Sequence, residues 1–71
     1  MKNAAEWKTI HMAKSEHAAK RAEEILAREG VLVKLSPVYR GVSGEDNYYE
    51  VRVLPAEAEE ARALLLDNGI V

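Results

Sequence analysis

Residues 48–53, Tyr-Tyr-Glu-Val-Arg-Val, form the stretch that decides the predicted fold of this 71-residue chain. Side chains alternate in character along it, which is the period of a β-strand with one buried face. The side chains predicted to face the core are Tyr49, Val51 and Val53, and those predicted to face away are Tyr48, Glu50 and Arg52. The segments on either side of this strand then set the order of the remaining elements.

A second strand is predicted at residues 31–36, with Pro37 ending it or marking it as an edge. Its inward side chains are Val31, Val33 and Leu35, and its outward side chains are Leu32, Lys34 and Ser36. Residues 38–47 are rich in Gly, Ser, Asp and Asn, which favours a turn. A connection of about ten residues is long for a hairpin, and long connections are more often functional.

Apolar residues at helical spacing predict two helices. Ser15 suits the N-cap of the first helix because its hydroxyl can accept an orphan N–H, and Gly30 supplies the left-handed residue that ends it. Pro55 suits the first turn of the second helix, which Asn68-Gly69 closes. The predicted buried stripes are Ala18, Ala22, Ile25 and Leu26 in the first helix and Ala58, Ala61, Leu64 and Leu65 in the second.

The first strand is predicted at residues 7–12, after a frayed polar lead at residues 1–6. Simple alternation puts Ile10 and Met12 on the core side and Trp7, Thr9 and His11 on the other side. Residues 7–71 then form a single α+β domain with the element order β-α-β-β-α.

This order favours the split β-α-β arrangement of the ferredoxin-like fold. A strand–helix–strand crossover is right-handed with its strands parallel, and the third strand fits antiparallel between them. We expect a three-stranded antiparallel or mixed sheet with both helices on one face. Only Ile70 and Val71 remain for the fourth strand of the complete fold, so the first strand would have a partly bare edge. Bare edges recruit partners.

The sheet face without helices is the predicted partner surface, because it is mixed polar and aromatic instead of evenly charged. Its residues are Trp7 at the margin, Thr9, His11, Leu32, Lys34, Tyr48, Glu50 and Arg52. The partner would be another protein or a second copy of the chain. A homodimer is a live expectation because small domains without disulfides often gain stability by oligomerising.

Composition excludes several classes of partner. Ten basic and twelve acidic residues give a net charge of −2, and the basic residues are interleaved with Glu, so no stripe for nucleic acid is indicated. No apolar run approaches the roughly 20 residues of a membrane span. The chain has no Cys, which fits a reducing compartment. We expect a cytoplasmic protein that contacts neither nucleic acid nor membrane.

Few residues of the chain form patterns typical of metal-binding, anion-binding or catalytic sites. His11 and His17 lack the spacing of zinc ligands, so we expect neither a metal site nor a cofactor. The candidate ligand loop comprises Gly41, Ser43 and Gly44, whose backbone N–H groups could hold an anion. The loop precedes a strand instead of a helix, however, and a hairpin turn is the better explanation. No nucleophile–base set is present, so we expect no catalytic residues.

Several segments resemble a family of short bacterial proteins described as proposed signal-transducing proteins, a ferredoxin-like domain of unknown function. The resemblance covers about residues 7–68 and implies a signalling role without established catalytic residues. It rests on Trp7-Lys8-Thr9, Arg28-Glu29-Gly30-Val31, Val33-Lys34-Leu35, Tyr49-Glu50-Val51-Arg52-Val53-Leu54-Pro55 and Glu57-Ala58-Glu59-Glu60-Ala61.

The leading hypothesis is a non-enzymatic regulatory or interaction module that binds a protein partner or itself through the first-strand edge and the open sheet face. The alternative is a small-ligand sensor for a nucleotide or an amino acid, using the long loop and the sheet face. The least favoured is an enzyme, although some similar proteins carry a glutamate decarboxylase label. A pyridoxal-phosphate decarboxylase needs a Schiff-base Lys and a phosphate cradle in a closed pocket, which so short a chain does not supply.

Overall fold

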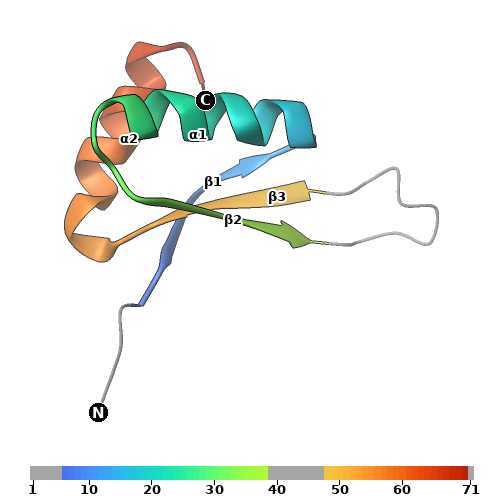
Figure 1. Ribbon diagram of the computed structural model, residues 1–71, viewed down its shortest axis with the longest axis horizontal. Helices are drawn as coiled ribbons and strands as arrows, with labels where there is room; N and C mark the ends of the chain where they lie inside the picture. Colours follow the sequence, from blue (N-terminus) through green and yellow to red (C-terminus); the bar gives the residue numbers. More distant parts are fainter. Residues whose placement is uncertain (1–5, 39–47, 71) are drawn as a thin grey trace.

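Three β-strands and two α-helices make up the part of the chain that the computed structural model describes, residues 6–38 and 48–70 (Figure 1). The elements are β1 (Lys8–Ala13), α1 (Glu16–Arg28), β2 (Val33–Val38), β3 (Tyr48–Val53), a 3-10 turn (Pro55–Glu57) and α2 (Ala58–Asp67). The predicted α+β class is therefore confirmed. Neither helix in these ranges has the length and apolar character needed to cross a membrane.

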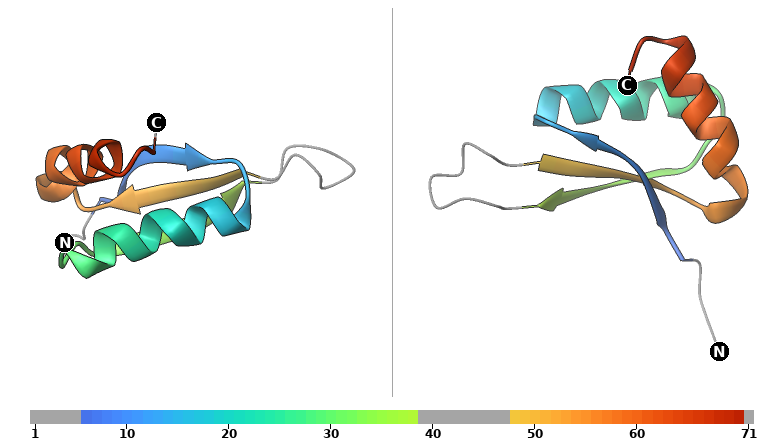
Figure 2. Two further views of the ribbon diagram at one scale, coloured as in Figure 1. Left: turned by 90° about the horizontal axis from the view of Figure 1, so that it is seen from above. Right: turned by 180° about the vertical axis from the view of Figure 1, so that it is seen from behind.

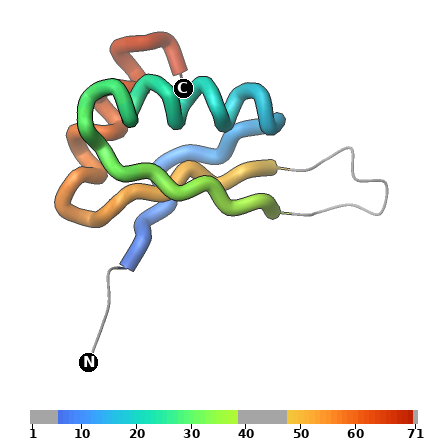
Figure 3. Tube along the Cα trace, in the orientation of Figure 1, coloured from blue at the N-terminus to red at the C-terminus, as the bar shows by residue number. Residues whose placement is uncertain are grey.

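The strands form one sheet in the order β1-β3-β2, so β3 is central and the other two strands lie at the edges (Figure 3). Both edge strands run antiparallel to β3. On the β2 side the register is regular, from Val33 opposite Val53 to Val38 opposite Tyr48. Residues directly opposite each other in an antiparallel pair have side chains on the same face, so the register assigns each side chain to a face.

The register of β1 shifts between Thr9 and His11, where the strand carries one extra residue. Thr9 lies opposite Arg52, and His11 lies opposite Val51. The prediction that His11 shares a face with Thr9 is therefore wrong, and so is the prediction that Met12 faces the core. A β-bulge adds one residue to one strand, which moves every later side chain to the opposite face.

β3 spans the predicted residues, whereas β2 begins and ends two residues later than predicted. The Val31 N–H donates to the Leu26 carbonyl oxygen at 3.0 Å, so Val31 belongs to the end of α1, where it is buried. Pro37 lies inside β2. An edge strand tolerates proline there because the missing N–H can face away from the sheet.

Local capping sets both ends of α1. Ser15 Oγ accepts a hydrogen bond from the Ala18 backbone N–H at 3.1 Å, as predicted for an N-cap. Gly30 has a φ of +86°, the left-handed conformation that follows a helix end. The buried side of the helix consists of Ala19, Ala22, Ile25 and Leu26. Ala18 of the predicted stripe is only half-buried.

The end of α2 turns the chain back toward the core. Asn68 Nδ2 donates to the Leu64 carbonyl oxygen at 2.8 Å, and Gly69 has a φ of +80°, so the predicted Asn-Gly stop is confirmed. The Ile70 N–H then donates to the Leu65 carbonyl oxygen at 2.9 Å. Ile70 is consequently partly buried and packs against the core.

The core lies where the two helices meet the sheet. Val51 and Val53 of β3 are completely buried, together with Leu26 of α1. The residues of α2 in the same core are Ala58, Ala61 and Leu65. Seen from above, α2 lies on the β1 side of the molecule and α1 on the β2 side (Figure 2). This arrangement places the last turn of α2 next to the β1 edge.

Candidate functional site

Most of the residues predicted to bind a partner lie on the face of the sheet that carries the Arg52 side chain. The pairing puts Thr9, Arg52 and Lys34 in one row across the three strands. A neighbouring row holds Met12, Glu50 and Ser36. The surface called the Arg52 face below comprises Trp7, Thr9, Met12, Lys34, Tyr48, Glu50 and Arg52.

Trp7 is held on the Arg52 face by two basic side chains. Arg52 Nη2 donates to the Trp7 carbonyl oxygen at 3.2 Å, and Lys34 Nζ lies 5.8 Å from the centre of the indole ring. A cation over a tryptophan ring contributes about 0.5–1 kcal/mol at an exposed site. Trp7 is half-buried, so the residue before β1 is part of the packed structure.

An acidic group accompanies the two cations of the Arg52 face. Arg52 Nε and Glu50 Oε1 are 3.9 Å apart, and each side chain is 32% exposed. A partly exposed pair at this distance contributes little to the free energy of unfolding. Arg52 Nε is buried and has no hydrogen-bond partner among the described residues. The face therefore combines two cations, one anion and two aromatic side chains.

Leu32 and Tyr48 lie near opposite ends of the β2–β3 ladder. Leu32 precedes β2 and is 61% exposed. Tyr48 pairs with Val38 at the far end and is half-buried. These two residues are therefore separated along the sheet, although both were predicted to belong to one partner surface. The candidate ligand loop of Gly41, Ser43 and Gly44 lies outside the described residues.

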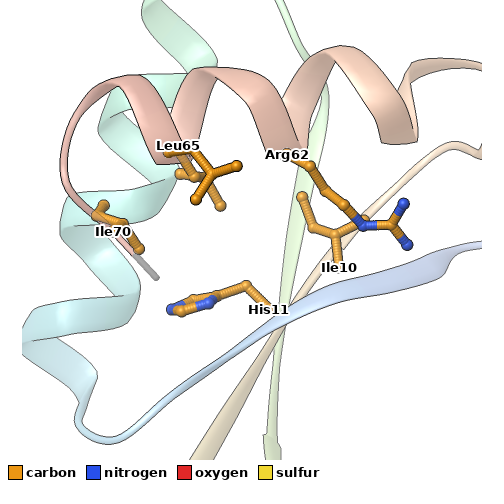
Figure 4. A pocket seen from close by; sticks show the side chains of 6 residues that line it. Ile10, His11, Arg62, Leu65 and Ile70 are labelled. Atoms are coloured by element: carbon orange, nitrogen blue, oxygen red, sulfur yellow. The ribbon is translucent and has the colours of Figure 1, made fainter.

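A groove runs between β1 and the C-terminal half of α2. Its more enclosed part is a hollow of about 160 Å³ (Figure 4). Ile10 and His11 line it from β1, while Leu65 and Ile70 line it from the opposite side. Arg62 lies at the end beside Ile10 (Figure 4). The register shift in β1 is what brings the His11 side chain into this hollow.

A second, more open hollow of about 360 Å³ continues the groove toward the end of β1. It shares His11 and Ile70 with the first hollow. Its other lining residues are Met12, Ala13, Lys14, Ala18 and Gly69. The two hollows together are called the edge groove below, because β1 is an edge strand of the sheet.

The charges that line the edge groove have one sign. Arg62 lines the first hollow and Lys14 the second, with His11 common to both. The acidic residues of α2 do not contribute to either lining; these are Glu59, Glu60 and Asp67. Leu66 on the rim is 61% exposed. The edge groove is therefore an apolar channel with a fixed positive charge toward each end.

Sequence reasoning missed this groove because it placed His11 on the wrong face and gave no role to Arg62. Two signals in the sequence point to it. Leu66 is the third of three consecutive leucines and falls outside the buried stripe of its helix. Ile70 is an apolar residue that follows the helix stop.

Neither surface assembles a catalytic or metal-binding set. Within residues 6–38 and 48–70, no three His, Asp or Glu side chains come together so that they could hold a metal ion. The lining of the edge groove contains no Ser or Thr beside His11.

Comparisons with protein-family models, with curated proteins and with solved structures found no match to this chain. They leave the resemblance to signal-transducing proteins untested.

Proposed function

We propose that this chain is a non-enzymatic regulatory module that binds an extended protein segment along the outer edge of β1. The observation that carries this proposal is the edge groove, which lies directly beside an edge strand. A segment added there can pair its backbone with β1 and seat alternate side chains in the groove. Strand addition of this kind takes affinity from backbone hydrogen bonds and specificity from side-chain pockets.

The proposal includes a ferredoxin-like arrangement with both helices on one face of the sheet. Val51 and Val53 are two residues apart on β3, so their side chains share a face, and residues of both helices join the same core with them. The strand order β1-β3-β2 agrees with the split β-α-β unit. In the complete fold a fourth strand follows the second helix and lies beside β1, which is where the added segment would lie.

The β1 edge suits strand addition better than the β2 edge. Pro37 lies within β2, and proline removes a donor that a pairing strand would use. Proline on an edge is one of the devices by which proteins prevent edge pairing. β1 contains no proline, and its pairing with β3 is regular from His11 to Ala13. The stretch His11–Ala13 is therefore the proposed pairing segment.

The Arg52 face extends the binding surface on the other side of the strand. Met12 lies opposite Glu50, is 40% exposed and lies directly next to the pairing edge. A partner that pairs with β1 would reach Met12 with the side chains that point away from the groove. Interfaces are enriched in methionine and aromatic residues, so Met12 and the nearby Trp7 suit the periphery of such a contact.

Site-specific photo-crosslinking tests this function. A photoreactive amino acid replaces Met12 in one sample and the exposed Glu24 of α1 in a second, and both are irradiated in native cell extract. We expect a discrete covalent adduct with another protein only from position 12. The adduct should disappear when Leu66→Glu is added and persist when the matched Ala63→Glu is added, since Ala63 is exposed on α2 outside the groove lining. Equal adducts from positions 12 and 24, or an adduct indifferent to Leu66→Glu, would rule the proposal out.

A further inference from the structure

We infer that the segment bound in the edge groove is acidic and has the pattern acidic–x–aliphatic–x–acidic. This inference rests on the proposed function and names the chemistry of its partner. It follows from three features of the groove: its length along β1, its apolar first hollow and the position of its two fixed cations.

The length of the groove fixes the spacing of the partner's side chains. The lining residues of β1 and its end run from Ile10 to Lys14. Ile10 to Lys14 is five residues, and the four steps of a paired strand beside them would span about 13 Å, because a strand rises about 3.3 Å per residue. A paired strand of the same length directs side chains i, i+2 and i+4 to one face. Three side chains of the partner therefore face the helix layer along the groove.

The first hollow, which extends from Arg62 and Ile10 to Ile70, accepts an apolar side chain. The first hollow, of about 160 Å³, is open on one side and is bounded by Ile10, Leu65 and Ile70, with Leu66 on its rim. An apolar cavity of about 150 Å³ is large enough for a benzene-sized group. Burying a Leu or Ile side chain there contributes favourable transfer free energy, while a polar side chain would lose hydrogen bonds to water. The central position of the partner is consequently aliphatic.

The two ends of the groove favour carboxylates. Arg62 lies beside Ile10 at one end (Figure 4), and Lys14 lines the hollow at the other. Within the described part of the chain, no acidic residue lines the groove, so none there neutralises these two cations. A carboxylate four residues from another on a strand can therefore meet Arg62 and Lys14 at the same time.

A second copy of this chain is a poor occupant by the same reasoning. The strand it would add is β1 itself, Lys-Thr-Ile-His-Met-Ala, followed by Lys14. That strand contains no acidic residue and would bring Lys8 and Lys14 of one copy against the cations of the other. Like charges directly across a strand pair are destabilising. The groove is thus complementary to an acidic partner and repels its own strand.

Titration of the full chain with capped peptides tests the inference. Two-dimensional NMR of the backbone amides monitors the titration. The probe is the heptapeptide SDTLTES, with SKTLTKS as the charge-reversed control and SDTSTES as the control without the aliphatic residue. We expect saturable shifts at His11–Ala13 and Ile70 with SDTLTES, and affinity at least about tenfold lower with either control. Arg62→Glu should largely abolish the preference for SDTLTES over SKTLTKS, because one cation and one carboxylate would then line the groove. The matched Arg21→Glu, at an exposed residue of α1, should leave the preference unchanged.

These outcomes distinguish a failure of the acidic pattern from a failure of the proposed function. Equal shifts at His11–Ala13 from all three peptides would overturn the acidic pattern but keep the β1 edge as a binding site. Shifts confined to the Arg52 face or to β2 would overturn both. Self-association detected by light scattering and abolished by Leu66→Glu would also overturn the acidic pattern, since it would show that the groove accepts the chain's own basic strand. Binding of free aspartate as tightly as SDTLTES would assign the groove to a small carboxylate ligand and overturn the peptide pattern.

Discussion

His11 lies opposite Val51 in the β1–β3 ladder. Thr9 lies opposite Arg52, so β1 has one extra residue between these two pairs. This single offset turns His11 toward α2 and leaves Met12 next to Glu50 on the other face. The edge groove exists in its observed form because of it. A one-residue shift has this effect because side chains alternate between faces with a period of two.

The offset predicts a specific contact for His11. The imidazole protons should give nuclear Overhauser effects to the methyl groups of Ile70 and Leu65, which line the same hollow. Trp7 and Thr9 should give none to those methyl groups. Contacts from the His11 ring to the Arg52 side chain instead would mean that β1 alternates without a bulge.

Leu26→Ala should destabilise the protein strongly. Leu26 is completely buried in the core, and removing such a leucine typically costs about 2–5 kcal/mol. The matched control is Leu66→Ala, which should change the free energy of unfolding by less than about 0.5 kcal/mol because Leu66 is 61% exposed. Urea denaturation followed by circular dichroism measures both. Comparable losses in the two variants would be incompatible with the described core.

Ser15→Ala should cost about 1 kcal/mol of stability, because it removes the side-chain oxygen that accepts the Ala18 N–H. Ser15→Asp should keep most of the stability, since aspartate is also a good N-cap. Thermal unfolding of the three proteins at one pH provides the comparison. If alanine and aspartate have the same effect, the hydroxyl does not cap α1.

Gly30→Ala should destabilise the protein by about 1 kcal/mol through backbone strain alone. Gly30 has a φ of +86°, and no atom lies within 4 Å of where a Cβ would be placed, so a steric clash does not contribute. Gly30→Asn should cost less, because asparagine tolerates the left-handed region. Denaturation midpoints of the variants measure these changes in stability. No change with Gly30→Ala would show that the turn adopts another conformation.

Lys34 and Trp7 should be energetically coupled. A double-mutant cycle with Lys34→Gln and Trp7→Leu is expected to give a coupling of about 0.5–1 kcal/mol, from the cation above the indole ring. The wavelength of Trp7 fluorescence should also respond to Lys34→Gln but not to Lys20→Gln, because Lys20 is on the exposed side of α1. Additive effects in the cycle would show that Lys34 does not contact the indole ring.

Local signals in the sequence predicted local structure well. The strand at 48–53, the Ser15 cap and the two positive-φ glycines each depend on a few neighbouring residues, and each is confirmed. The later start of β2 was not predicted because Val31 is bonded back to α1, which the alternation of its side chains does not reveal.

Features that depend on pairing between distant residues were harder to predict. The bulge in β1 is set by its pairing with β3, more than 35 residues later in the chain, and alternation within residues 7–12 carries no sign of it. The groove needs the return of Ile70 onto the core, which follows from a hydrogen bond at the end of α2. Thr9, Arg52 and Lys34 share a face, as predicted, because Thr9 precedes the extra residue of β1.

Amide hydrogen exchange in the presence and absence of the SDTLTES peptide tests the central claim most directly, because it reports backbone pairing at each residue. We predict that the amides within His11–Ala13 that point away from β3 become protected when the peptide binds, while those of Lys34–Ser36 on the β2 edge exchange at unchanged rates. Protection at the β2 edge, or peptide binding without new protection in β1, would contradict it.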